Sequence, residues 1–127
     1  MKEIFAVIRQ NMINQTKDAL RDAGFPSMTC SKVMGRGKKQ IAVQILDAVN
    51  NSLNSPESVG LAQITEAYRL LPKRFINIVV KDDEVKKIAK IIIDVNSTGK
   101  PGDGKIFVMP INEVYRIRTG ESGEIAV

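Results

Sequence analysis

The stretch "RFINIVVKDDEVKKIAKIIIDVN", residues 74–96, decides more about the fold than any other part of the sequence. Its beginning, residues 74–80, is rich in β-branched and aromatic side chains, which is typical of a strand. Acidic residues follow at 82–84, where negative charge stabilises the start of a helix. The next apolar residues recur at helical spacing: Val85, Ile88, Ala89, Ile92 and Val95. The stretch therefore predicts a strand followed by an amphipathic helix that runs to Asn96.

The start of the chain repeats this order. Residues 2–9, "KEIFAVIR", predict a buried strand, and residues 14–24 predict a helix with Asn14 as its N-cap. Gly24 supplies the left-handed residue that commonly ends a helix, and Pro26 prevents its continuation.

Two more stretches complete the predicted sheet. Residues 28–35, "MTCSKVMG", alternate as a strand does. Residues 104–112, "GKIFVMPIN", predict a fourth strand, in which Pro110 indicates an edge position or the end of the strand. The order β-α-β, β-α-β predicts an α+β fold, a ferredoxin-like split βαβ sandwich (βαββαβ) with one antiparallel sheet and both helices on one face.

Length and composition limit the class of protein. With 127 residues, 43% of them hydrophobic, we expect residues 1–127 to form a single domain. No stretch approaches the ~20 apolar residues that span a bilayer, so we expect a cytoplasmic protein without membrane insertion. One cysteine and no histidine exclude an internal disulfide and make a zinc site or a histidine-based catalyst implausible.

The net charge of +5 would attract polyanions. The basic residues are mostly interleaved with acidic ones, as in "KDDEVKKIAK", and few aromatic residues are present for base stacking. We therefore expect no direct nucleic-acid binding and favour a basic pocket for a small anion.

Residues 37–72 form an unusually long connection between the second and third strands. Apolar residues at helix-compatible spacing flank its polar centre, "NNSLNSPES". One reading is a small helical insert packed on the domain, and the other is a recognition arm that orders against a partner.

The stretch "STGKPGDGKIFVMPI", residues 97–111, has almost the spacing of a P-loop, with Gly99, Gly104 and Lys105 in place. Ile106 stands where a P-loop has Ser or Thr, and a strand follows where a P-loop has a helix. This excludes a conventional phosphate loop but leaves a glycine-rich turn that could face an anion.

A basic pair, Arg116 and Arg118, follows this strand. In an extended segment over 114–120 the spacing would place both guanidinium groups on one face, where they would suit a polyphosphate. The alternative is an edge strand with a solvated basic face.

These motifs together resemble a known family. "TGKPGDGKIFV" followed by "VYRIRTGE" resembles the C-terminal signature of the nitrogen-regulatory PII signal proteins. "MKEIFAVIR", "ALRDAGF" and "KVMGRGK" fall at the spacings of that family, so the resemblance covers residues 1–38 and 73–122.

The resemblance implies a trimer that binds ATP or ADP in clefts between neighbouring subunits and 2-oxoglutarate beside Mg²⁺. It implies a sensor rather than an enzyme, with ligand-dependent loop states controlling a target protein. The implied nucleotide-binding residues are Val7, Met28, Thr29, Gly35, Gly37, Lys38, Val79, Gly102, Gly104, Lys105, Arg116 and Arg118. The implied 2-oxoglutarate residues are Lys39, Gln40 and Lys73, and no metal ligand is assigned.

Three positions depart from the pattern of the family. Lys39 stands where a glutamine near Mg²⁺ is common, so either the register shifts by one to Gln40 or the site binds differently. Lys38 replaces an arginine, which keeps the charge but loses bidentate geometry, and Asn77 replaces an acidic residue.

The long loop lacks the tyrosine stretch that is uridylylated in many bacterial members, and Tyr68 resembles part of a helix face instead. Such a loop is similar to that of the branch encoded beside nitrogenase genes in archaea and some anaerobes, which implies nitrogenase as the target and a homotrimer or a mixed assembly with a paralogue. The alternatives are regulation of an ammonium channel or a biosynthetic enzyme, and a nucleotide-using enzyme with Asp103 as its base. An indirect effect on transcription through a protein partner also stays open.

Overall fold

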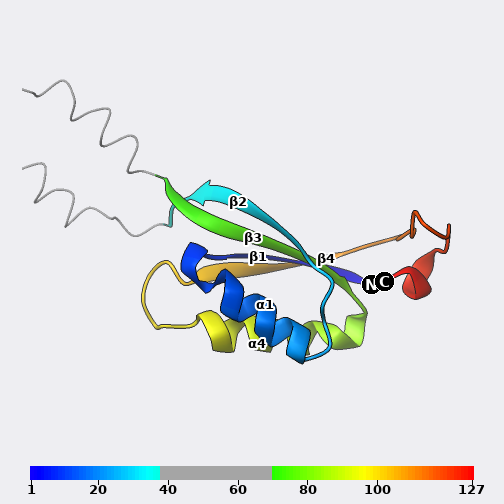
Figure 1. The fold of residues 1–127 in the computed structure, drawn as a ribbon, viewed down its shortest axis with the longest axis horizontal. Coiled ribbons are helices and arrows are strands. Elements are labelled where there is room, and N and C mark those ends of the chain that lie inside the picture. Colours follow the sequence, from blue (N-terminus) through cyan, green and yellow to red (C-terminus); the bar gives the residue numbers. More distant parts are fainter. Residues whose placement is uncertain (38–69) are drawn as a thin grey trace, which may run out of the picture. The chain divides into compact units, whose positions relative to one another are not determined.

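The computed structural model describes residues 1–37 and 70–127 (Figure 1). Its strands are β1 (Lys2–Arg9), β2 (Thr29–Gly35), β3 (Leu71–Val80) and β4 (Gly104–Pro110). Its helices are α1 (Ile13–Asp22) and α4 (Val85–Asn96), and 3₁₀ turns cover Gln10–Met12, Asp82–Glu84 and Gly123–Ala126.

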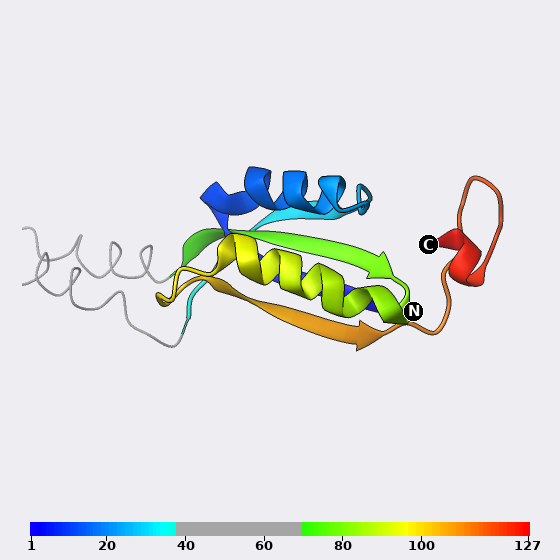
Figure 2. The same ribbon diagram turned by 90° about the horizontal axis from the view of Figure 1, so that it is seen from below.

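The four described strands form one sheet in the order β2-β3-β1-β4. The central strand β1 is antiparallel to β3 on one side and to β4 on the other. Figure 1 and Figure 2 show α1 and α4 side by side on the same face of this sheet. The predicted ferredoxin-like α+β fold is therefore confirmed.

Alternation along the strands separates a core face from a face without helices. The buried residues Ile4, Ala6 and Ile8 of β1 lie on the core face, with Ile76 and Ile78 of β3 paired beside them. The two helices complete the core with Leu20, Ile88 and Ile92. The intervening strand residues lie on the opposite face, where the rings of Phe5 and Phe75 are 5.1 Å apart.

A buried polar contact joins the two helices. The Nδ2 atom of Asn96 donates to Thr16 Oγ1 at 3.0 Å and to the Ile92 carbonyl at 2.9 Å. Thr16 Oγ1 in turn donates to the Met12 carbonyl at 2.7 Å. Asn96, which the sequence marks only as the end of a helix, thus also fixes how α1 and α4 pack.

The predicted elements are nearly all present. The strand over 2–9 is confirmed, Gly24 ends α1 with a φ of +95°, and β4 is an edge strand that ends at Pro110. The capping role of Asn14 is wrong: helical geometry begins earlier, in the 3₁₀ turn after Arg9, so Asn14 lies inside α1 and its N-cap position is Met12.

The chain divides into two compact units, residues 1–33 with 73–127 and residues 34–72. The core and most candidate site residues belong to the first. The long connection predicted over 37–72 lies largely outside the described residues, so its role and the single-domain organisation over 1–127 stay predictions.

Candidate functional site

The glycine-rich turn before β4 is organised by the carboxylate of Asp103. Its Oδ2 atom accepts hydrogen bonds from the backbone N–H groups of Thr98 at 2.8 Å and Gly99 at 3.1 Å. Its Oδ1 atom accepts one from the Thr98 hydroxyl at 2.5 Å and forms an ion pair with Arg9. The Thr98 hydroxyl, and secondarily Arg9, hold the pKa of Asp103 far below the ordinary range of an aspartate.

Three glycines give this turn its shape. Gly99, Gly102 and Gly104 have φ values of +75°, +97° and +117°, a region that side chains strongly disfavour. At Gly104 a Cβ atom would lie 1.9 Å from the Val7 carbonyl oxygen, because β4 begins there directly against β1. This glycine is thus required by the sheet itself, whatever the turn binds.

Cations surround the turn. Lys73 Nζ donates to the Gly102 carbonyl at 3.0 Å, and Arg9 Nη2 donates to the Pro101 carbonyl at 3.0 Å. Partial burial, and secondarily the Arg9 cation, lower the pKa of Lys73, while Asp103 opposes this shift. Lys105 pairs with Val7 in the β1–β4 register and so lies on the face without helices.

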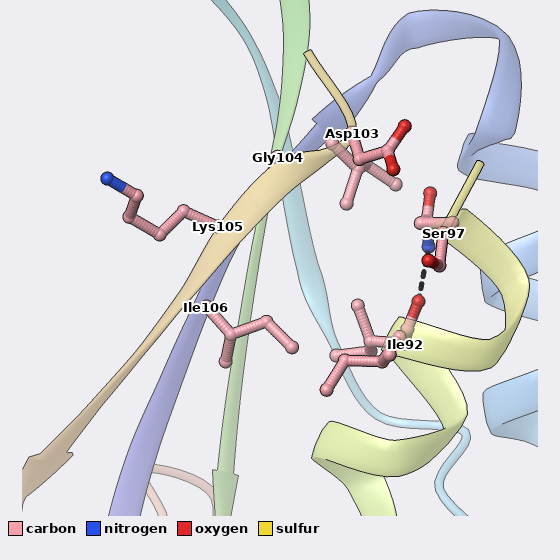
Figure 3. A pocket seen from close by; sticks show the side chains of 9 residues that line it. Ile92, Ser97, Asp103, Gly104, Lys105 and Ile106 are labelled. Atoms are coloured by element: carbon pink, nitrogen blue, oxygen red, sulfur yellow. Dashed lines mark hydrogen bonds between the residues drawn. The ribbon is translucent and has the colours of Figure 1, made fainter. Parts of the chain in front are cut away.

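Figure 3 shows how β4 divides its side chains at this point. Ile106 points toward Ile92 of α4, whereas Lys105 points away from the helix. Between α4 and β4 lies a mainly apolar cavity of about 340 Å³, which Asp103 borders at the turn end. Gly104 and Lys105 also border this cavity, but the ammonium end of the Lys105 side chain points away from it.

The basic pair after β4 adopts a different conformation from the predicted one. The N–H groups of Thr119 and Gly120 both donate to the Arg116 carbonyl, at 3.3 and 2.7 Å, so a turn replaces the extended segment. The Arg116 side chain forms an ion pair with Glu121 and donates to the Ile125 carbonyl at 2.8 Å. The prediction that Arg116 and Arg118 share one face of an extended segment is therefore wrong.

The cations around the glycine-rich turn and the basic pair Arg116 and Arg118 lie at opposite ends of the sheet. Figure 1 and Figure 2 show the connection before β4 at one end and the segment after β4 at the other. β4 has seven residues, so its ends are about 20 Å apart at the usual rise per residue. Within one chain, Arg116 therefore does not join Lys105 around a phosphate.

The other predicted site residues also lie toward one or the other end of the sheet. Arg9 and Lys73 pair at the turn end, with Val7 two positions further along β1, whereas Val79 pairs with Glu3 at the far end. Thr29 begins β2 and Met28 packs against the core, also at the far end. The candidate residues are thus divided between the two ends of the sheet: Val7, Lys73, Gly102, Gly104 and Lys105 lie toward one end, and Met28, Thr29, Val79, Arg116 and Arg118 lie toward the other.

Some predicted residues cannot be placed with these groups. Lys38, Lys39, Gln40 and Tyr68 lie outside the described residues. Gly35 ends β2 and Gly37 follows it, and both belong to the unit of residues 34–72. Their predicted roles stay predictions.

Arg9 is the residue that the sequence reasoning missed. It was included only as the end of a strand, yet it contacts both Asp103 and Pro101. The available signal was its position: an arginine on the last residue of a buried strand, in phase with Val7 rather than with the core residue Ile8, lies at the sheet end where the turn must also lie.

In residues 1–37 and 70–127, no group of three or more His, Cys, Asp or Glu side chains is placed to hold a metal ion. In the same part of the chain, no helix is long and apolar enough to cross a membrane.

Comparisons with known proteins agree on one family. The family model described as Nitrogen regulatory protein P-II matches residues 1–121. A "Nitrogen fixation nifHD region GlnB-like protein 2" of Methanothermobacter marburgensis is 42% identical over 127 residues, covering 100% of both chains. The protein of the same name from Methanobacterium ivanovii is 44% identical, covering 100% of this chain and 99% of its own. A "Nitrogen regulatory protein P-II 2" of Methanothermobacter thermautotrophicus is 41% identical, covering 100% and 97%.

Proposed function

The chain belongs to the nitrogen regulatory protein P-II family, and from this premise we propose that it senses adenine nucleotides and 2-oxoglutarate and controls a protein target. The proposed nucleotide site lies between copies of the chain. One copy contributes the glycine-rich turn with Lys105, and its neighbour contributes Arg116 and Arg118. Assembly of three copies, as the family resemblance implies, would repeat this cleft around a cyclic axis.

The observation that carries this proposal is the division of the candidate residues between the two ends of one sheet. Backbone N–H groups of a turn and an ammonium group are at one end, and guanidinium groups are at the other. Both kinds of group suit phosphate oxygens. Because about 20 Å separates the ends, a polyphosphate can contact both groups only where two copies meet.

The turn is also suited to an anion in its details. Gly102 lies beside two cationic side chains, since a Cβ atom there would lie 3.4 Å from Arg9 Nη2 and 3.7 Å from Lys73 Nζ. Two cations therefore approach the backbone where a phosphate would lie. MgATP would supply the polyphosphate and the metal, and the residues of this chain would hold and orient it.

For 2-oxoglutarate we propose Lys73 as the main contact among the described residues. Lys73 Nζ already donates to the Gly102 carbonyl, so a carboxylate bound by Lys73 would lie against the nucleotide turn. Each ligand would then influence the binding of the other, and the loop of residues 37–72 would respond through its differential affinity for the ligand states.

The proposed target is nitrogenase. Relatives that match this chain over its full length are named for the nifHD region of nitrogen fixation. A P-II protein of this group would release its target when 2-oxoglutarate rises. The runner-up targets remain an ammonium channel and a biosynthetic enzyme.

An enzymatic function has less support. Its candidate base was Asp103, but that carboxylate accepts hydrogen bonds from Thr98 and Gly99 and is paired with Arg9. Its lowered pKa makes it a weak proton acceptor at neutral pH.

The test is calorimetric titration of the purified protein with MgATP, with and without 2-oxoglutarate. Wild-type protein is expected to bind MgATP, and Arg116→Ala with Arg118→Ala is expected to weaken binding about tenfold or more, the loss of at least one charge-assisted contact. Arg21→Ala is the control, because Arg21 makes only exposed ion pairs with Asp18 and Asp22 on α1. Unaltered affinity in the double variant would contradict the assignment of the arginines.

The target is tested separately by affinity capture from nitrogen-fixing cell extract. Nitrogenase is expected on the immobilised protein with MgATP, and its recovery should fall when 2-oxoglutarate is added. Recovery of an ammonium channel or a biosynthetic kinase instead would favour the runner-up targets.

A further inference from the structure

The contact between Arg9 and the glycine-rich turn calls for a functional explanation. The side chains of Arg9 and Asp103 are 26% and 24% exposed, so their ion pair is partly buried. The two residues are 94 positions apart in the sequence, and the pair joins the end of β1 to the turn before β4. A second contact, from Arg9 Nη2 to the Pro101 carbonyl, strengthens this junction.

Closing the turn does not require Arg9. Asp103 already accepts hydrogen bonds from the N–H groups of Thr98 and Gly99 and from the Thr98 hydroxyl. These contacts lie within the turn and are of the kind that closes a turn. Arg9 must therefore contribute something other than local closure.

What Arg9 contributes is compensation of charge. Asp103 stands between Gly102 and Gly104, the glycines whose N–H groups are proposed to face phosphate oxygens. An ionised carboxylate at that place would repel a polyphosphate at close range. The Arg9 guanidinium cancels this charge while leaving the turn-closing hydrogen bonds intact.

We propose that Arg9 is a positioning residue of the nucleotide site: it neutralises Asp103 and ties the glycine-rich turn to β1, so that the turn can receive a polyphosphate. The inference rests on the proposed function, which assigns phosphate to this turn. In this role Arg9 acts through its contacts with Asp103 and the Pro101 carbonyl.

Charge compensation predicts a specific rescue. Arg9→Gln leaves Asp103 ionised and uncompensated, so ATP affinity should fall about tenfold or more, since a charge-assisted pair is worth at least that factor. Adding Asp103→Asn removes the carboxylate charge and should restore most of the affinity. Arg9→Lys keeps the charge and should lose much less than Arg9→Gln.

A second measurement, the dependence of the affinity loss on ligand charge, separates charge compensation by Arg9 from a loss of the fold. Repulsion by Asp103 grows with ligand charge, so the loss in Arg9→Gln should be largest for ATP, smaller for ADP and smallest for AMP. Loss of the folded state would weaken all three alike. Arg21→Gln is the matched control, because it makes the same substitution in an ion pair on the exposed surface of α1.

The experiment is calorimetric titration of the three nucleotides into the full-length wild type, the Arg9 variants and the control, with thermal unfolding measured for each. The inference is overturned if Arg9→Gln binds ATP as the wild type does, or if the double variant is no better than Arg9→Gln. Wild-type protein that bound no nucleotide would overturn the proposed function together with the inference.

Discussion

Two different reasons can explain a glycine at position 104, a phosphate-binding turn or close packing of two strands, and the sequence alone does not separate them. A glycine at this position fits a phosphate-binding turn, and the sequence suggested that reading. The structure supplies an independent reason, because β4 begins against β1 with no room for a side chain. A glycine in such a motif is therefore weak support for a ligand until its backbone surroundings are known.

Gly104→Ala should destabilise the fold. The new Cβ atom would meet the Val7 carbonyl at 1.9 Å, and the φ of +117° is unfavourable for alanine. We expect the free energy of unfolding in urea to fall by about 2 kcal/mol or more.

Gly99→Ala is the matched control for this prediction. Its φ of +75° is also positive, but no atom lies within 4 Å of the added Cβ. Only the backbone cost of about 1 kcal/mol should appear. Equal losses in the two variants would show that close approach to Val7 is not what fixes Gly104.

At the scale of elements, regular segments could be predicted from the sequence and terminal ones could not. β1 and α4 follow from alternation and helical spacing, since burial of one face imposes those periods. The start of α1 was missed because the 3₁₀ turn before it continues the helical path, and a capping residue such as Asn14 carries no signal about that. The conformation of residues 114–120 was missed because contacts of Arg116 with Glu121 and Ile125 hold this segment as a turn.

The site shows the same limit. Both basic groups and the glycine-rich turn were found from sequence, because their residue types carry chemistry directly. Their separation by the length of β4 was not foreseen, since spacing along a chain does not give distance when a strand lies between. Arg9 was missed because its partner, Asp103, is 94 positions away.

The turn of residues 98–103 should contribute stability that depends on pH. The pKa of Asp103 is lowered by hydrogen bonds from Thr98 and by Arg9, so the unfolded chain takes up a proton before the folded chain does. The stabilisation is thus fully present above the ordinary aspartate pKa of about 3.9 and is lost as the pH falls toward the lower folded value.

Asp103→Asn should remove this dependence. The variant should be less stable than the wild type at pH 7, and the two should converge in the free energy of unfolding below about pH 4. Urea unfolding at several pH values between 2 and 7 measures the free energy of unfolding of both proteins. Asp94→Asn is the control, because Asp94 makes an exposed ion pair with Lys90 at 2.6 Å. A difference between wild type and Asp103→Asn that stayed constant with pH would contradict the role of the charge.

At the scale of the whole molecule, the arrangement of the sheet explains why a sensor of this kind would need more than one copy. A single chain has the glycine-rich turn and Lys105 at one end of the sheet and Arg116 and Arg118 at the other, and the length of β4 separates them. Under the proposed function, joining the two ends of different copies would complete a nucleotide site that neither copy has alone. Ligand binding and assembly would then be linked, because nucleotide would stabilise the contact between copies.

Subunit mixing tests this directly. Lys105→Gln damages only the turn end, and Arg116→Gln with Arg118→Gln damages only the other end, so each variant alone should bind ATP weakly at every site. In a cyclic trimer containing both variants, one junction joins two intact ends, so random mixing in equal amounts should restore about one site in four to wild-type affinity. The measurement is ATP titration of trimers reassembled from denaturant, compared with the same variants combined without reassembly. If each site were built within one chain, no mixture would recover any strong sites, and the division between copies would be wrong.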